Sequence, residues 1–150
     1  MNDTVALIVL IAQVVGSVGM FGVIWTIQLV HYPLMRAIPA EAFVRYEQLH
    51  TRAISLVVGP LMAIEGVSVL AVFFLRPAGV PAWSTWAGGL AEAVAIGVTA
   101  FISAPTHGRL EGGADPGLLD RLIATNWLRT AAWTTRAALA IYMLVVHLRR

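Results

Sequence analysis

The chain has 150 residues, of which 59% are hydrophobic and only 12% are charged. This composition is too apolar for a soluble protein, and the length allows a single domain, residues 1–150. The absence of cysteine excludes disulfides, thiolate metal sites and thiol redox chemistry. The net charge of +2 comes from arginines that are scattered along the chain, so the sequence does not favour nucleic-acid binding.

Four apolar stretches fill most of the sequence, and each is close to the ~20 residues that a membrane-spanning helix needs. They are residues 5–30, 53–75, 83–102 and 131–146. We therefore predict an all-α fold, a four-transmembrane-helix bundle with up-down topology. Its helices are expected at approximately residues 4–31, 39–75, 82–104 and 116–148. Such a protein would reside in the cell inner membrane as a multi-pass protein, with the lipid bilayer as its main partner.

The first two helices are separated by a short linker. Pro33 disfavours helical geometry at Tyr32, which predicts the end of the first helix at His31. Pro39 reads as the first helical residue of the second helix, which can then run to Leu75. At 1.5 Å per residue this helix is roughly 55 Å long, so its first third is expected to extend beyond the ~30 Å hydrocarbon core.

The third helix contains Gly89, Ala93 and Gly97 at a four-residue spacing. Small residues in this pattern let two transmembrane helices approach closely, which predicts a homo-oligomer formed through this face. Asp115 followed by Pro116 is typical of an N-cap and a first helical residue, and marks the start of the fourth helix. Like the second helix, the fourth is expected to begin outside the membrane on the same side.

The distribution of arginine predicts the orientation of the chain. Six arginines lie on the side of the two long loops: Arg36, Arg45, Arg52, Arg109, Arg121 and Arg129. The other side carries Arg76, Arg149 and Arg150. By the positive-inside rule the long loops are expected in the cytoplasm and both termini outside.

Polar side chains gather at the ends of the helices next to these long loops. His31, His50 and His107 come from three different helices, and Asn126 and Arg129 lie at the start of the fourth span. Up-down topology brings these ends to one face of the membrane, so the three imidazoles could bind a metal or a haem together. The alternative is that they are interfacial side chains that do not meet.

We predict that His31, His50, His107 and Arg129 are the catalytic residues of such a site. The three histidines are also the candidate metal ligands. A bound cofactor or substrate would be contacted by residues near the same helix ends and deeper in the fourth helix: Tyr46, Asn126, Trp127 and Arg136. Guanidinium groups suit an anionic or carbonyl oxygen, and the aromatic rings suit an apolar substrate.

Three ionisable residues are predicted near the middle of the membrane, namely Glu65, Glu92 and Arg136. Each costs ~2.5–3.5 kcal/mol at that depth unless it faces the bundle interior and finds a partner. One interpretation is an ion pair that only fixes helix packing. The other is a cavity below the histidines that sets their charge and the path of a proton.

The sequence resembles a family of small bacterial four-helix inner-membrane proteins of unknown function. The similar segments are WTIQLVHYP (25–33), FVRYEQLHTRAISLVVGPLM (43–62), Pro105-Thr106-His107 with Leu110, and TNWLRTAAWTTR (125–136). More remotely, the four-helix layout and the Trp/Arg-rich last helix are similar to the anthrone oxygenase-like membrane proteins. That similarity implies a cofactor-poor oxidation of aromatic polyketides.

Two functional hypotheses follow from these observations. The first is a redox or oxygenase-type activity on a small apolar substrate, at a His/Arg site on the membrane-interface end of the bundle. The second is a non-enzymatic membrane protein, such as a transport, accessory or oligomeric scaffold subunit. The sequence alone leaves open whether the protein is an enzyme.

Overall fold

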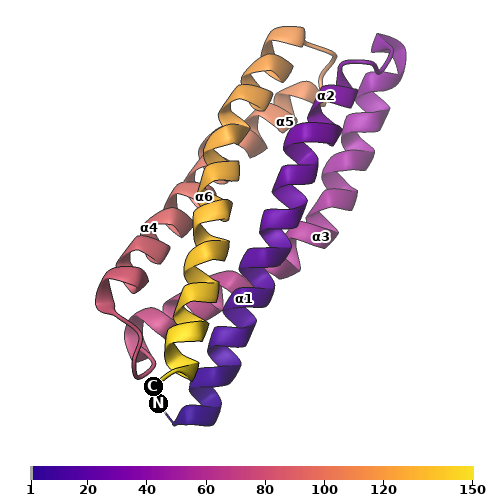
Figure 1. The fold of residues 1–150 in the computed structure, drawn as a ribbon. Coiled ribbons are helices and arrows are strands. Elements are labelled where there is room, and N and C mark those ends of the chain that lie inside the picture. Colours follow the sequence, from indigo (N-terminus) through magenta and orange to yellow (C-terminus); the bar gives the residue numbers. More distant parts are fainter. Residues whose placement is uncertain (1) are drawn as a thin grey trace.

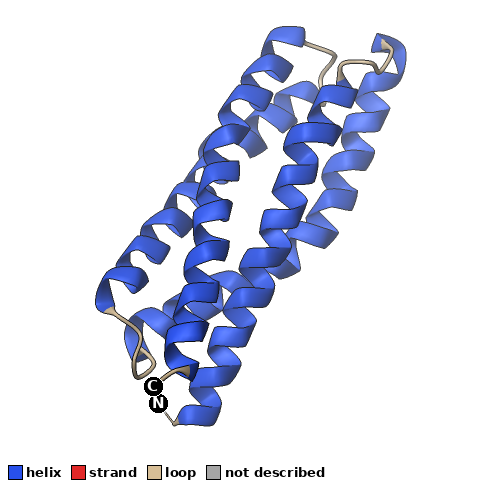
Figure 2. Cartoon of the chain, in the orientation of Figure 1, coloured by secondary structure: helices blue, strands red, loops and turns tan. Residues whose placement is uncertain are grey.

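A computed structural model describes residues 2–150, and within that range the chain contains only helices and short connections (Figure 2). Four long helices cover most of it. Their segments are α1 (Asp3–Thr26), η1 (Ile27–His31) and α2 (Tyr32–Met35) in the first; α3 (Ala40–Leu75) in the second; α4 (Ala82–Val98), η2 (Thr99–Ser103) and α5 (Ala104–Leu110) in the third; and α6 (Pro116–Leu148) in the fourth.

The helices run alternately up and down, so that both termini lie at one end and the connections after α2 and α5 lie at the other (Figure 1). The predicted all-α four-helix bundle is therefore confirmed. With 36 residues, α3 is about 54 Å long and exceeds the ~30 Å of a hydrocarbon core, as predicted. The loop end of α6, which has 33 residues, extends in the same direction.

The distribution of polar and apolar side chains is that of a membrane protein. Leu56 and Phe101 are 79% and 83% exposed, whereas Glu47 and Glu65 are 0% exposed. Water would penalise this outward apolar surface, whereas lipid accommodates it at no such cost. All four long helices are also long and apolar enough to cross a membrane, which makes the chain a multi-pass integral membrane protein.

The first and third helices extend beyond their predicted ends. In each, a wide π-helical turn lies just before the proline and lets the helix continue past it. The N–H of Tyr32 donates to Ile27 O and the N–H of Ala104 donates to Thr99 O, both of the i→i−5 type. Proline follows directly in each case and has no N–H to donate. The wider turn absorbs this missing bond, so the helices end at Met35 and Leu110 rather than at residues 31 and 104.

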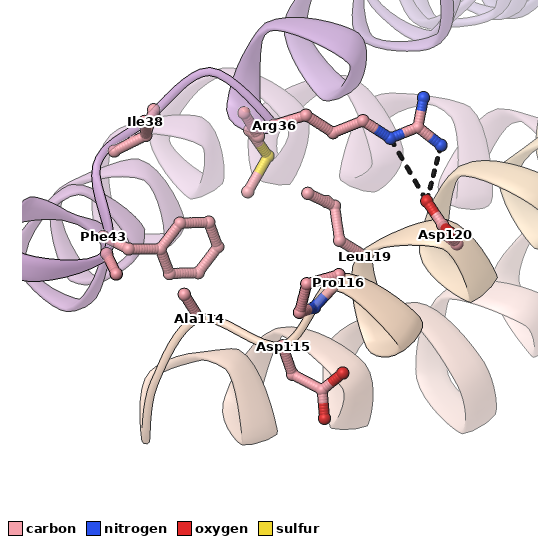
Figure 3. Close-up of a pocket in the computed structure, with 10 residues that line it drawn as sticks. Arg36, Ile38, Phe43, Ala114, Asp115, Pro116, Leu119 and Asp120 are labelled. Carbon is pink, nitrogen blue, oxygen red and sulfur yellow. Dashed lines mark hydrogen bonds and ion pairs between the residues drawn. The ribbon is translucent and has the colours of Figure 1, made fainter.

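The loop end of the bundle is held by polar contacts. Arg36 donates two hydrogen bonds to Asp120 Oδ1, at 3.1 and 2.6 Å, and so ties the first helix to α6 (Figure 3). Beside this ion pair lies a hollow of about 470 Å³ whose walls include Phe43 and Leu119. Asp115 accepts from the Leu118 N–H at 3.0 Å, which confirms its predicted N-cap role.

Candidate functional site

The three histidines of the loop end lie together. His31 ends η1, His50 lies in α3 and His107 lies in α5. The ring centroids of His31 and His50 are 4.3 Å apart, and those of His50 and His107 are 5.3 Å apart. The up-down topology thus brings three imidazoles from three helices into one group, each partly buried.

His107 occupies the centre of a hydrogen-bonded chain. Its Nδ1 contacts Glu47 Oε1, and its Nε2 lies 3.0 Å from the Tyr32 hydroxyl. Glu47 is 0% exposed and Tyr32 is 1% exposed, so water competes for neither contact. A buried carboxylate holds an N–H at Nδ1, which leaves Nε2 to accept from the phenol. If His107 takes up a proton, Nε2 donates instead and the phenol hydrogen is free to turn toward a ligand.

The imidazole rings of His31 and His50 are held by weaker hydrogen bonding than the ring of His107. The Tyr46 hydroxyl lies 3.4 Å from each ring nitrogen of His31, a distance at the long limit of a hydrogen bond. The Tyr46 and His50 rings are nearly parallel, with an interplanar angle of 6° and centroids 6.3 Å apart. Among residues 2–150 no hydrogen-bond partner of the His50 ring is found, so both of its nitrogens are available to a ligand.

Arg129 is a buried guanidinium without a carboxylate partner. It is 6% exposed, and its Nη1 donates to Asn126 Oδ1 at 3.0 Å. Asn126 in turn donates to Gln28 Oε1 at 2.7 Å, which fixes the amide orientation. Within the described chain Arg129 forms no ion pair, and its Nε has no hydrogen-bond partner. A buried cation in this state favours the binding of an anionic or strongly polar oxygen.

Four of these residues line one pocket of about 290 Å³ beside α3 and α5, whereas His31 and Glu47 are not part of its lining. Tyr32, His50, His107 and Arg129 belong to its polar lining, to which Glu111 adds a carboxyl group. The apolar part of the lining includes Ile27, Ile54 and Val58. The buried hydroxyl of Ser103, which has no hydrogen-bond partner within the part of the chain that the structure describes, belongs to a residue that also lines the pocket. The arrangement suits a small, mostly apolar molecule with one polar oxygen.

A shared metal or haem site stays a prediction. No group of three or more histidine or acidic side chains within residues 2–150 has an arrangement that could hold a metal ion. His107 already uses both ring nitrogens in hydrogen bonds, so it would have to release Glu47 or Tyr32 in order to bind a metal. The two less constrained imidazoles, His31 and His50, are free of this conflict.

Two residues predicted to contact a cofactor lie away from this pocket. Trp127 is 48% exposed and packs edge to face on Trp25, with ring centroids 5.8 Å apart. Arg136 lies two turns further along α6 than Arg129 and forms ion pairs with Glu65 and Glu92. Tyr46 contacts His31 at the edge of the histidine group, and Asn126 reaches the site only through Arg129.

Glu47 and Tyr32 were not predicted from the sequence as site residues. Phe43, Glu47, His50 and Ile54 follow one another at spacings of four, three and four, which places them on one face of α3. An acid within such a buried face is a signal for an interior ion pair. Tyr32 gave no comparable signal. The π turn before it rotates the following residues around the helix axis, so regular helical periodicity does not predict which face Tyr32 occupies.

The chain matches no known protein-family model, and comparisons with curated proteins and with solved structures found no significant match.

Proposed function

We propose that the protein is a membrane-embedded enzyme that moves a proton on a small, mostly apolar substrate with a carbonyl or phenolic oxygen. The proposed reaction is of the redox or oxygenase type. The observation that supports it is one pocket lined by Arg129, which has no carboxylate partner, by His50, and by Tyr32 and His107 of the chain that continues to Glu47. A pocket that only fixed helix packing would have no use for an unpaired guanidinium.

Each group has a distinct role in this proposal. Arg129 holds the substrate oxygen and stabilises the negative charge that develops on it when a neighbouring proton leaves. His50 takes that proton, since its ring nitrogens have no other partner. Tyr32 then returns a proton to the oxygen that leaves as water. His107, protonated from the aqueous side, resupplies that proton to Tyr32 through Nε2, and Glu47 stabilises the imidazolium before this transfer. His50 releases the proton that it took to the aqueous side, so the cycle consumes no net proton.

The resemblance to anthrone oxygenase-like proteins gives this scheme a specific reaction. Deprotonation of anthrone gives an electron-rich enolate that reacts with dioxygen. The balanced outcome is anthrone plus dioxygen to anthraquinone plus water, so one oxygen atom enters the product and the other leaves as water. The protein groups would supply the base, the oxyanion site and the protons.

We also propose that this end of the bundle faces the cytoplasm of the inner membrane, on the basis of the arginine distribution. A substrate dissolved in the inner leaflet would then reach the pocket from the lipid. The wall formed by Ile54 and Val58 lies on the part of α3 that leads from the histidines into the apolar span.

The experiment is an anthrone oxidation assay with purified protein in detergent, followed by anthraquinone absorbance and oxygen uptake. We expect the parent protein to accelerate the reaction and His50→Gln to lose about 10²-fold or more of the rate. His147→Gln is the matched control, because His147 lies at the opposite end of the bundle and bonds Ala78 O at 2.9 Å. Equal rates for the parent, His50→Gln and buffer alone would contradict the proposal.

A further inference from the structure

A second cluster of charged side chains lies in the middle of the bundle, separate from the histidine pocket. Arg136 of α6 lies between Glu65 of α3 and Glu92 of α4. Its Nε donates to Glu65 Oε1 at 3.0 Å and lies 3.4 Å from Glu92 Oε2. The three residues are 1%, 0% and 4% exposed, respectively.

Helix α1 also packs against this cluster, and its polar contacts with the charged side chains come from the neutral residues Ser17 and Gln13. Ser17 donates to Glu65 Oε1 at 2.6 Å and accepts from Arg136 Nη2 at 3.4 Å. The Gln13 amide oxygen, in the orientation that satisfies both groups, accepts from Arg136 Nη1 and Nη2 at 3.1 Å each. The cluster therefore sets two carboxyl groups against one guanidinium. With both acids ionised it has an uncompensated negative charge in an apolar interior, which is strongly unfavourable.

Glu65 and Glu92 both lie next to the Arg136 guanidinium, but only Glu65 accepts a hydrogen bond from it. Gly88 of α4 lets the helix approach the guanidinium, since a Cβ at that position would lie 2.6 Å from Arg136 Nη1. Glu65 has good hydrogen bonds from Arg136 and Ser17. Among residues 2–150 Glu92 has no such bond, and both of its carboxyl oxygens are buried without a hydrogen-bond partner. The uncompensated charge is therefore located on Glu92.

Glu92 also lines a large apolar groove. The groove lies between α3 and α4 and has a volume of about 770 Å³. Its rim is formed by Phe74, Trp86 and Phe101, which are 76%, 66% and 83% exposed and therefore face the lipid. Gly89 is among the small residues that keep it open. A buried acid with unpartnered oxygens thus lies at a groove that opens toward the hydrocarbon phase.

We propose that this groove binds a hydrophobic organic cation from the lipid phase, with its charge balanced by Glu92. In the unoccupied state one proton on Glu92 neutralises the cluster. When the cation enters, this proton leaves to the aqueous buffer and the cation takes its place, so the net charge of the cluster is unchanged. The aromatic rings of Trp86 and Phe73 offer the cation favourable faces in addition.

A second copy of the chain fits the groove less well. Gly89, Ala93 and Gly97, the residues predicted to form a homo-oligomer, line this same groove. A helix from another copy that carries no positive charge at mid-membrane depth could cover the groove only while Glu92 keeps its proton, and would gain no attraction from the acid. Every arginine other than Arg136 lies outside the four apolar stretches of the sequence, and Arg136 and Arg129 are buried in their own chain. Charge complementarity therefore favours a separate cation.

The first test measures binding of tetraphenylphosphonium, a lipophilic cation, to the purified protein in detergent by titration calorimetry. We expect saturable binding by the parent with release of one proton per cation, seen as a dependence of the heat on buffer ionisation. Glu92→Gln should weaken binding at least 10-fold, and the exposed Glu41→Gln should not. Tetraphenylborate, an anion of the same shape, should not bind.

The second test fills the groove without touching the charged cluster. A side chain at Gly89 or at Gly59 meets no atom within 4 Å at its Cβ, so both positions accept substitution, but only Gly89 lines the groove. Gly89→Leu should abolish tetraphenylphosphonium binding and Gly59→Leu should leave it intact. Circular dichroism and gel filtration check that each variant is folded.

Four results would overturn this inference. They are no saturable binding by the parent, equal binding by Glu92→Gln, equal binding of the borate anion, and a dimer that Gly89→Leu dissociates, which would assign the groove to a second copy. The His50→Gln variant should bind the cation as the parent does, because His50 does not line the groove. Failure of the oxidation assay and failure of this test are therefore distinguishable.

Discussion

The Tyr32 hydroxyl and the His107 Nε2 lie 3.0 Å apart although 75 positions separate them in the chain. Each residue lies just after a π turn, which closes when an N–H donates to the carbonyl oxygen of the fifth preceding residue. A proline follows each turn, Pro33 in the first helix and Pro105 in the third, so both helices depart from regular α-helical bonding at the level where the phenol and the imidazole meet. Glu47 completes the chain from the opposite side of His107.

Loss of the Tyr32 hydroxyl should slow anthrone oxidation without unfolding the protein. Tyr32→Phe keeps the buried ring but removes the group that returns a proton, so we expect a fall in kcat of about 10²-fold or more. Tyr142→Phe is the control, since Tyr142 packs on Trp83 near the other end of the bundle. A Tyr32→Phe variant with the parent's kcat would show that the phenol takes no part in proton transfer.

Glu47 should be required for stability as well as for activity. Glu47→Ala leaves the Nδ1–H of His107 without its buried partner, and an unsatisfied buried donor costs about 1–3 kcal/mol. The thermal unfolding temperature in detergent should therefore fall clearly, while the exposed Glu41→Ala should change it little. Glu47→Gln keeps a hydrogen-bonding group of the same shape, so it should be folded and yet slow. Wild-type activity in folded Glu47→Gln would argue against a charged partner for His107.

Arg129 is expected to act on the substrate oxygen. Arg129→Gln removes the charge and the planar fork, and the loss of one such donor costs about 10²–10³-fold in kcat. Arg129→Lys keeps the charge but loses the second donor, so it should recover only part of the rate. Arg121→Gln, an exposed position on the same helix, serves as the control. If Arg129→Lys were as fast as the parent, charge alone would account for the role of this residue.

The orientation can be tested with single cysteines, because the natural chain has none. Ala78 and Ala114 are exposed in the connections at opposite ends of the bundle. In intact cells a membrane-impermeant maleimide should label Ala78→Cys, and it should label Ala114→Cys only after permeabilisation. The reverse pattern would place the histidine pocket outside the cytoplasm.

The sequence was sufficient to predict the fold because the four apolar stretches have the length of a membrane span and are separated by short polar segments. The meeting of His31, His50 and His107 at one end follows from alternating helix direction alone. The extent of the first and third helices could not be predicted, because the rule applied to Pro33 assumes regular α-helical bonding and the π turn does not follow it.

The composition of the site was only partly predictable for a related reason. Arg129 and Arg136 were assigned to one site, yet seven residues of helix separate them by about 10 Å along the axis. The structure gives Arg136 to the mid-bundle acids and leaves Arg129 with the histidine pocket. Glu47, three residues before His50, was not assigned to the site because its segment is rich in exposed charges, and only its helical face distinguishes it from them.

The most direct test is ¹⁵N NMR of the histidine rings in detergent, with His107 assigned through His107→Gln. The hydrogen-bonded chain predicts two distinct ring-nitrogen resonances for His107, one protonated and one accepting a hydrogen bond. Glu47→Gln and Tyr32→Phe should both shift them, and Tyr142→Phe should leave them unchanged. A single averaged signal typical of a freely exchanging imidazole, insensitive to Glu47 and Tyr32, would contradict the chain and the mechanism that depends on it.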